Sequence, residues 1–292
     1  MQIIKISPRG FCFGVVNAWK IVQKTIQSNP NKRIFMLGWF VHNKNMLEEV
    51  SASNLFLLDD TNTSRYQLVQ DLEVIDGDIL ILSAHGTDNK TKLLALQKGL
   101  EVIDTTCEYV YKTHDVIKEA LSQNKTVIYL GKKNHPESLA AISIDKKILF
   151  ITELEQLKNL KDYFDKEVVV TNQTTLSIYD LEQYYDFIKK HFQKYVLKND
   201  LCVATQERQE ALINLKTKLT KLIVVGDPKS NNSNQLLKIG KYKKIPNCYL
   251  VNNLKELKQI IFSDDDIVGI TSGASTPTKT TNEIIKYLEG LN

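Results

Sequence analysis

Long apolar runs are missing from this sequence, and every run falls short of the ~18 residues that a membrane-spanning helix needs. The first residues, MQIIKISPRG, lack the apolar core and the small-residue cleavage site of a secretory signal. The Walker A and G-x-G-x-x-G patterns of nucleotide sites are missing too. The net charge of +4 is too small to indicate nucleic-acid binding. We therefore expect neither a membrane nor a nucleic acid as partner.

Glycine and proline are scarce as well, with 12 and 6 residues among 292, while 42% of the chain is hydrophobic and 25% is charged. This composition is ordinary for a globular protein, and the length allows one large domain or three small ones. We expect a cytoplasmic location, or a plastid-type organelle if a transit peptide precedes this sequence. In such a reducing compartment, four cysteines are better explained as ligands, nucleophiles or buried residues than as disulfides.

Three of the four cysteines stand at equal intervals, because Cys12, Cys107 and Cys202 are separated by 95 residues each time. Each one ends an apolar run and precedes a pattern typical of an amphipathic helix. Equal spacing over this distance indicates one module written three times. Three modules around a pseudo-threefold axis would bring three thiolates to one point.

The segments between the cysteines repeat in the same order. After each helical pattern comes a short apolar run that ends in glycine, at Gly38, Gly131 and Gly226. Further strand-like and helical segments then alternate, which favours parallel sheets flanked by helices. We predict an α/β fold of three pseudo-threefold-related modules, each a small, mainly parallel sheet with flanking helices, around a central iron–sulfur site. The predicted modules are 14–106, 107–201 and 202–292, with 1–13 packing against the third.

The chemistry of the three cysteines points to a metal centre. Each lies where a strand leads into a helix, and a helix N-terminus favours a thiolate. Structural zinc sites use four ligands with local C-x₂-C pairs, which are absent here. Three remote thiolates suit an iron–sulfur cubane with one iron left open. The alternative is that they are small buried residues repeated by descent, as we expect for Cys248 within a strand-like segment.

Polar side chains gather in the loops at the strand ends, where parallel sheets bind ligands. Histidines and small hydroxyls there suit a compact anion such as a diphosphate, although the same residues also cap helices. A carboxylate in such a loop can deliver protons or complement a helix dipole. His114 and His191 lie in helical patterns, so we expect them on the surface. The loop residues are His42, His85, His135, Glu137, Thr174, Thr175, Ser230, Asn232 and Ser275.

Several motifs together resemble one enzyme family along essentially the whole chain. These are PRGFCFGV, FVHN, SAHG, DTTC, NHPE, QTTLS, RQEA, SNNSN and GAS-x-P, in this order. The sequence is similar to the 4-hydroxy-3-methylbut-2-enyl diphosphate reductases, the LytB family. The resemblance implies reductive removal of the substrate's allylic hydroxyl, which gives isopentenyl and dimethylallyl diphosphate as the last step of the methylerythritol phosphate route. A ferredoxin, a flavodoxin or a reductase would supply the electrons.

The resemblance also implies residue roles. One 4Fe-4S cluster with one open iron would be held by Cys12, Cys107 and Cys202. Glu137 would supply the proton, Thr174 would orient the hydroxyl, and His135 would assist protonation. The implied substrate-binding residues are His42, His85, His135, Thr174, Thr175, Ser230, Asn231, Asn232 and Ser275.

Several positions depart from the family pattern, and rival interpretations stay open. Glu108 stands where proline is usual, beside a predicted cluster ligand, and Asn231 stands where serine or glycine is usual in the phosphate loop. An enzyme similar to quinolinate synthase or to the diphthamide-forming enzymes would also place one cluster cysteine in each module. An iron–sulfur redox sensor would need no glutamate and no phosphate-binding loop.

Overall fold

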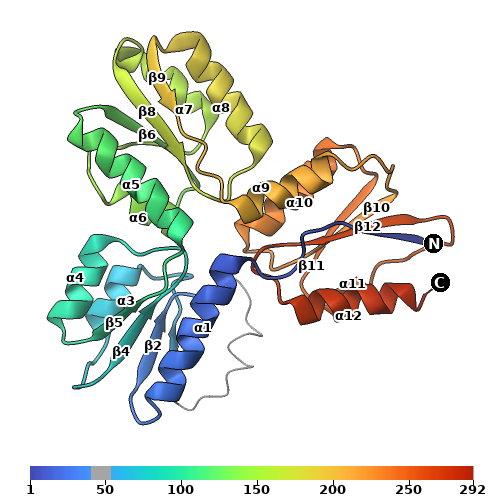
Figure 1. Cartoon of the computed structure of the whole chain (residues 1–292), viewed down its shortest axis with the longest axis horizontal. Helices are drawn as coiled ribbons and strands as arrows, with labels where there is room; N and C mark the ends of the chain where they lie inside the picture. Colours follow the sequence, from blue (N-terminus) through green and yellow to red (C-terminus); the bar gives the residue numbers. More distant parts are fainter. Residues whose placement is uncertain (41–53, 292) are drawn as a thin grey trace.

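The structure is a computed structural model that describes residues 1–40 and 54–291. It contains three four-stranded parallel sheets, which lie in three lobes around a common centre (Figure 1). The predicted α/β fold with three parallel sheets flanked by helices is therefore confirmed. None of the helices in the described part of the chain has the length and apolar character to cross a membrane.

The first sheet has the strand order β3-β2-β4-β5. Its central strands β2 and β4 are fully buried, because helices or loops cover both faces of the sheet. Such burial on two faces explains the continuous apolar runs in the sequence. The elements of this lobe are α1 (Phe13–Ser28), β2 (Ile34–Leu37), β3 (Leu55–Leu58), α3 (Arg65–Asp71), β4 (Ile79–Leu82), α4 (Asn89–Gln97) and β5 (Glu101–Asp104).

The second sheet repeats this arrangement with the order β7-β6-β8-β9. Its elements are α5 (Glu108–Ser122), β6 (Thr126–Leu130), α6 (Pro136–Ile142), β7 (Leu149–Ile151), α7 (Leu154–Lys158), the 3-10 helix η1 (Lys161–Tyr163), β8 (Glu167–Asn172), α8 (Ile178–His191) and β9 (Lys194–Leu197).

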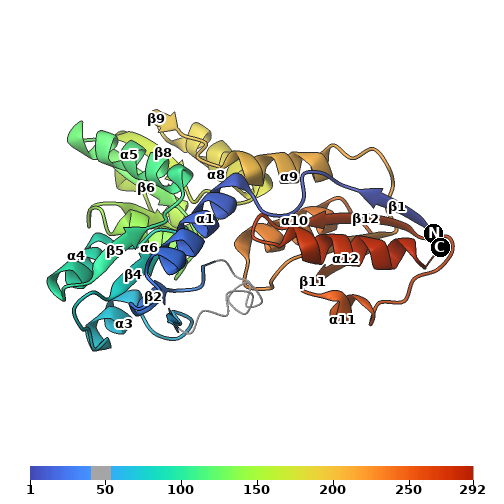
Figure 2. The ribbon, with the colours of Figure 1, turned by 60° about the horizontal axis from the view of Figure 1, so that its bottom comes forward.

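The third sheet combines the last part of the chain with its first strand, in the order β1-β12-β10-β11. Ile3 of β1 is paired with Val268 of β12, so that the two termini lie close together at the end of this lobe (Figure 2). Its elements are β1 (Gln2–Lys5), α9 (Val203–Ile213), β10 (Lys221–Val225), α10 (Asn231–Tyr242), β11 (Asn247–Val251), α11 (Leu254–Leu257), β12 (Ile267–Ser272) and α12 (Thr278–Glu289).

One backbone hydrogen bond recurs at all three junctions between lobes. The edge strands β1, β5 and β9 each lead to a cysteine that is the N-cap of the next long helix. The N–H of that cysteine donates to a carbonyl in the loop that follows the neighbouring strand. The bonds are Cys12 to Ala274 at 2.9 Å, Cys107 to Ala84 at 3.0 Å and Cys202 to Thr174 at 3.0 Å.

The hydrophobic core is divided between the two faces of each sheet. In the first lobe, Ile34 and Met36 pack with Val22 of α1, while Phe35 and Leu37 pack with Val69 of α3. This follows from the period of two along a strand. Each sheet is therefore held rigidly between two layers of side chains, and its strand-end loops project toward the centre from a fixed frame.

His114 contradicts the expectation of a surface histidine. Only 8% of it is exposed, because it shares one face of α5 with Val110 and Ile117. Burial, together with the charges of Lys118 and Lys92, lowers the pKa of His114 to about 4. A histidine placed three and four residues from apolar neighbours thus belongs to the buried stripe of the helix. This spacing was already visible in the sequence.

Shortening a buried side chain in the core of the third lobe should destabilise the folded protein. Ile284 of α12 is fully buried in the cluster between α12 and its sheet. Ile284→Ala is expected to lower the free energy of unfolding by about 2–5 kcal/mol, because it removes buried methyl groups and leaves a cavity. Urea denaturation followed by circular dichroism measures this. The matched variant Ile261→Ala, at a side chain that is 87% exposed, should change it by less than about 0.5 kcal/mol; equal effects would contradict the packing described.

Candidate functional site

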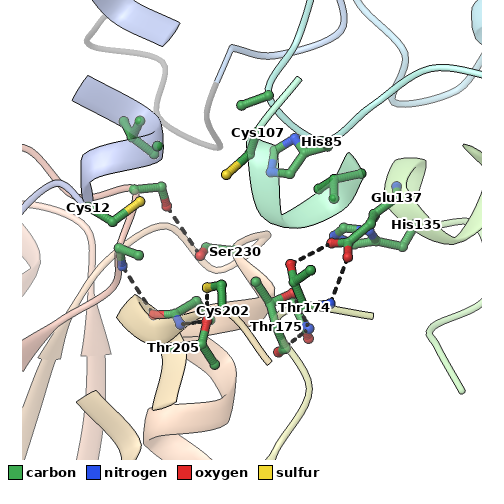
Figure 3. A pocket seen from close by; sticks show the side chains of 18 residues that line it. Cys12, His85, Cys107, His135, Glu137, Thr174, Thr175, Cys202, Thr205 and Ser230 are labelled. Carbon is green, nitrogen blue, oxygen red and sulfur yellow. Dashed lines mark hydrogen bonds between the residues drawn. The ribbon is translucent and has the colours of Figure 1, made fainter. Parts of the chain in front are cut away.

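The three N-cap cysteines meet at the centre of the molecule. Their sulfurs point into one cavity (Figure 3). A Cβ atom on Gly14 would lie 2.8 Å from Cys107 Sγ and 3.9 Å from Cys12 Sγ. Only glycine therefore leaves room for the sulfurs at this point, directly after the first cysteine loop.

Burial decides the protonation of these thiols. It raises the pKa of Cys107, and it raises the pKa of Cys202 to about 11, although both stand at helix N-termini. The Cys202 thiol donates a hydrogen bond to Thr205 Oγ1 at 3.0 Å. As expected, the backbone N–H groups at these helix ends lower the thiol pKa, but desolvation outweighs them. A thiolate at either position needs a bound cation to offset the cost of burial.

The donor set fits a centre with several metal atoms. Within residues 1–40 and 54–291, no three His, Cys, Asp or Glu side chains are placed to share one metal ion. In an iron–sulfur cluster, each cysteine sulfur binds a different iron. Three soft thiols without an acidic ligand suit such a cluster better than they suit Mg²⁺, Ca²⁺ or a structural zinc ion.

Glu137 is the buried acid of the cavity. It is 2% exposed, and its carboxyl group accepts two hydrogen bonds from Thr174, from the backbone N–H at 2.6 Å and from Oγ1 at 3.1 Å. Burial raises the pKa of Glu137 to about 7, and the two bonds from Thr174 oppose this rise only in part. The group can therefore give up or accept a proton near neutral pH.

The sequence NHPE fixes this geometry locally. His135 is the N-cap of α6, Pro136 is its first residue, and His135 Nδ1 accepts a hydrogen bond from the Glu137 N–H at 3.2 Å. Because Nδ1 accepts, a neutral His135 carries its proton on Nε2. The ring of His85, from the loop after β4, meets the His135 ring edge to face at 5.6 Å. Two histidines from two lobes thus line one side of the cavity.

The third lobe supplies the opposite wall. Ser230 is the N-cap of α10, and its Oγ accepts hydrogen bonds from the Ser233 N–H at 3.4 Å and from Ser275 Oγ at 3.3 Å. Asn231 Nδ2 donates to the carbonyl of Thr175 at 2.7 Å and to its hydroxyl at 3.0 Å. The capping role and the site role therefore coexist in these residues, and Asn231 ties the third lobe to the second.

Asn232 likewise links the third lobe to the cysteine loops through hydrogen bonds. Its Oδ1 accepts from the Ala274 N–H at 3.1 Å, and its Nδ2 donates to Thr205 Oγ1 at 2.9 Å. Thr205 in turn accepts from the Cys202 thiol. The wall that the third lobe supplies and the cysteine loops are thus joined by one hydrogen-bond network.

The structure brings all but one of the candidate residues to this cavity. His42 lies outside the described residues. Thr205, Ala84 and Ala274 also line the cavity and were not singled out from the sequence. Ala84 and Ala274 occupy the same place in the loops SAHG and GAST that Thr174 occupies in QTTL, and this repeated position was the signal available. The candidates that line the cavity are Cys12, His85, Cys107, His135, Glu137, Thr174, Thr175, Cys202, Ser230, Asn231, Asn232 and Ser275.

Comparison with known proteins agrees with this arrangement. The family described as "LytB protein" matches residues 3–289. The chain belongs to the LytB family. A relative from Malacoplasma penetrans is 44% identical over 99% of this chain and 97% of its own length, and one from Bacillus subtilis is 38% identical over 99% and 91%. Both relatives carry the name 4-hydroxy-3-methylbut-2-enyl diphosphate reductase.

Solved structures of LytB-type enzymes share the fold. The E-1-hydroxy-2-methyl-but-2-enyl-4-diphosphate reductase of Plasmodium falciparum matches with a TM-score of 0.88 and 28% identity, over 98% of this chain and 87% of that one. A second, described as the terminal enzyme of the non-mevalonate pathway, matches with a TM-score of 0.68 and 25% identity, over 99% of this chain and 100% of that one.

The buried acid should give stability a specific pH dependence. The folded protein holds the Glu137 proton more tightly than the unfolded chain, where the pKa is about 4.5. The stability that this bound proton contributes is therefore fully present below about pH 4.5. It is lost as the pH rises through about 7. Urea denaturation at a series of pH values should show Glu137→Gln gaining stability relative to the unmodified protein across this window. Glu155→Gln, at a side chain that is 72% exposed, is the control and should show no such trend. A constant difference for Glu137→Gln would contradict the raised pKa.

Proposed function

We propose that the chain is a 4-hydroxy-3-methylbut-2-enyl diphosphate reductase. It converts its allylic diphosphate substrate to isopentenyl and dimethylallyl diphosphate by reductive removal of the hydroxyl group. The observation that carries this proposal is the single cavity, in which three cysteines, a buried acid of raised pKa and a wall of anion-binding donors meet. The family membership and the names of full-length relatives support the same reaction.

Cys12, Cys107 and Cys202 hold one 4Fe-4S cluster with one open iron in this proposal. When bound, the cluster supplies single electrons and a Lewis acid for the substrate hydroxyl. The support is the donor set: three thiols, one from each junction between lobes, whose burial makes an unpaired thiolate unfavourable. Cys248 of β11 lies in another part of the third lobe, packed against the core beneath α10, and takes no part.

The remaining walls bind the diphosphate. Ser230, Asn231 and Asn232 surround the first turn of α10, where free N–H groups and the helix dipole favour an anion. The histidines face this turn across the cavity and add donors from the first and second lobes. The proposed binding set is His42, His85, His135, Thr174, Thr175, Ser230, Asn231, Asn232 and Ser275. A tail anchored from three lobes fixes the reacting carbon in place.

Glu137 provides the proton that lets the hydroxyl leave. As the substrate's C–O bond breaks, the proton of Glu137 passes to the departing oxygen, which leaves as water. The allyl group that remains has gained the two electrons and takes up a second proton, from solvent, at carbon. Thr174 holds the carboxyl group in place through both of its hydrogen bonds and orients the substrate hydroxyl. With a pKa of about 7, the acid can be reprotonated from solvent between turnovers. His135, beside Glu137, assists the protonation.

The electron donor is a ferredoxin, a flavodoxin or a reductase in this proposal, because the reaction consumes two electrons and the cluster passes them singly. We also propose that the modules run from 14 to 106, from 107 to 201 and from 202 to 292, with 1–13 packed on the third. The change of sheet at each cysteine supports these boundaries.

The proposed cluster can be tested by replacing a cysteine ligand, with Cys248 as the control. Anaerobically reconstituted protein is expected to bind about four iron per chain and to absorb broadly in the visible region. Cys107→Ser should abolish that absorption and lower the iron content, since one of the three thiol ligands is lost. Iron analysis and absorption spectra measure both. Cys248→Ser is the matched control and should keep the full complement; loss of iron there, or its retention in Cys107→Ser, would refute the ligand set.

Replacement of the acid tests the reaction itself. Glu137→Gln should lower turnover of the allylic diphosphate by about 10²–10⁴-fold, because amide and carboxyl have similar shape but only the acid can donate the proton. Substrate affinity should stay nearly unchanged. The measurement is an anaerobic assay with reduced methyl viologen as the electron donor, together with a binding titration. Glu155→Gln should turn over normally, and unchanged turnover in Glu137→Gln would remove this residue from the proton path.

A further inference from the structure

Arg208 of α9 is a buried cation without an acidic partner. It is 3% exposed, and it forms no ion pair with any carboxylate in the described part of the chain. Its Nη1 donates to the carbonyl of Ala204 at 2.8 Å and its Nη2 to the carbonyl of Gly10 at 2.7 Å. Its Nε is buried without a hydrogen-bond partner. A buried guanidinium normally has a counter-charge, because removing it from water is costly.

One hydrogen bond ties Arg208 to the loop before Cys12, and the other ties it to the first turn of its own helix, next to Cys202. Gly10 stands two residues before Cys12, and Ala204 stands two residues after Cys202. All three cysteines and Arg208 line a second cavity, separate from the one that contains Glu137 and the histidines. The cysteines thus lie between the two cavities, and Arg208 adjoins them from the side away from the diphosphate wall.

Electrostatics point the same way. Burial lowers the pKa of Arg208, and the largest effects that oppose this are the negative charges of Cys12 and Cys202, ahead of Glu207. As ligands, these two sulfurs would carry negative charge and would offer the counter-charge that Arg208 lacks. With neutral thiols the guanidinium would stay uncompensated.

We propose that Arg208 is the counter-charge of the cysteine-bound centre and stabilises its reduced state. This rests on the proposed function, in which the centre accepts one electron at a time. Each electron makes the centre one unit more negative while no bond breaks, so a fixed cation beside it favours the reduced form and raises the midpoint potential. Net charge and hydrogen bonds to sulfur are known determinants of such potentials. Arg208 is a positioning residue that acts through the centre and touches no substrate.

The test compares midpoint potentials. Unmodified protein, Arg208→Gln and Arg208→Lys are reconstituted anaerobically, matched for iron content and titrated with dithionite under electron paramagnetic resonance. Arg208→Gln should shift the reduction equilibrium at least tenfold toward the oxidised form, which is about 59 mV for one electron. Arg208→Lys keeps the charge and should shift it by less than half as much. Arg33→Gln, at the opposite end of the first sheet, removes a charge far from the centre and should leave the potential unchanged.

The outcomes separate this inference from the proposed function. A loaded Arg208→Gln with an unshifted potential would refute the inference alone, as would equal shifts in the glutamine and lysine variants. If Arg208→Gln cannot retain iron, a loaded Arg208→Lys near the original potential supports the charge assignment, whereas loss of iron from both variants refutes it. Unmodified protein without iron after reconstitution would refute the proposed centre and this inference together.

Discussion

The structure depends on one hydrogen bond that is made three times, from the backbone N–H of a cysteine to a carbonyl in the neighbouring strand-end loop. Each bond joins the loop after an inner strand of one sheet, which is β12, β4 or β8, to the N-cap of a helix that packs on the next sheet. The rigid sheets therefore fix where the thiols lie, and the thiols need no ordering of their own. Because the acceptors Ala84, Thr174 and Ala274 line the central cavity, the proposed metal site and the proposed substrate site share one backbone frame.

Burial without full compensation is the common property of the groups that do chemistry here. It raises the pKa values of Cys107, Cys202 and Glu137, and it leaves the Arg208 guanidinium without a carboxylate partner. In the proposed function, a bound cationic centre would offset the burial of the cysteine thiolates, and the charge on their sulfurs would supply the counter-charge of Arg208.

The architecture could be predicted from the sequence because the equal spacing of the three cysteines and the order of the apolar runs indicate it directly. Sequence reasoning also found the loop residues from Cys12 to Ser275, since strand ends and helix starts are visible as patterns. It could not find the partners that folding brings from afar. Thr205 became a neighbour of Asn232 only through the packing of α9 and α10. His114 was misplaced because its polarity was weighed above its position on the helix.

The pairing of β1 with β12 sets an order of events for synthesis. Gln2 and Ile267 are partners, although nearly the whole chain lies between them. The loop that carries Cys12 can therefore reach its final place only after the last strand has left the ribosome. Until then only Cys107 and Cys202 can be in place, although all three cysteines have been made. In the proposed function, assembly of the three-cysteine centre would therefore follow the synthesis of β12.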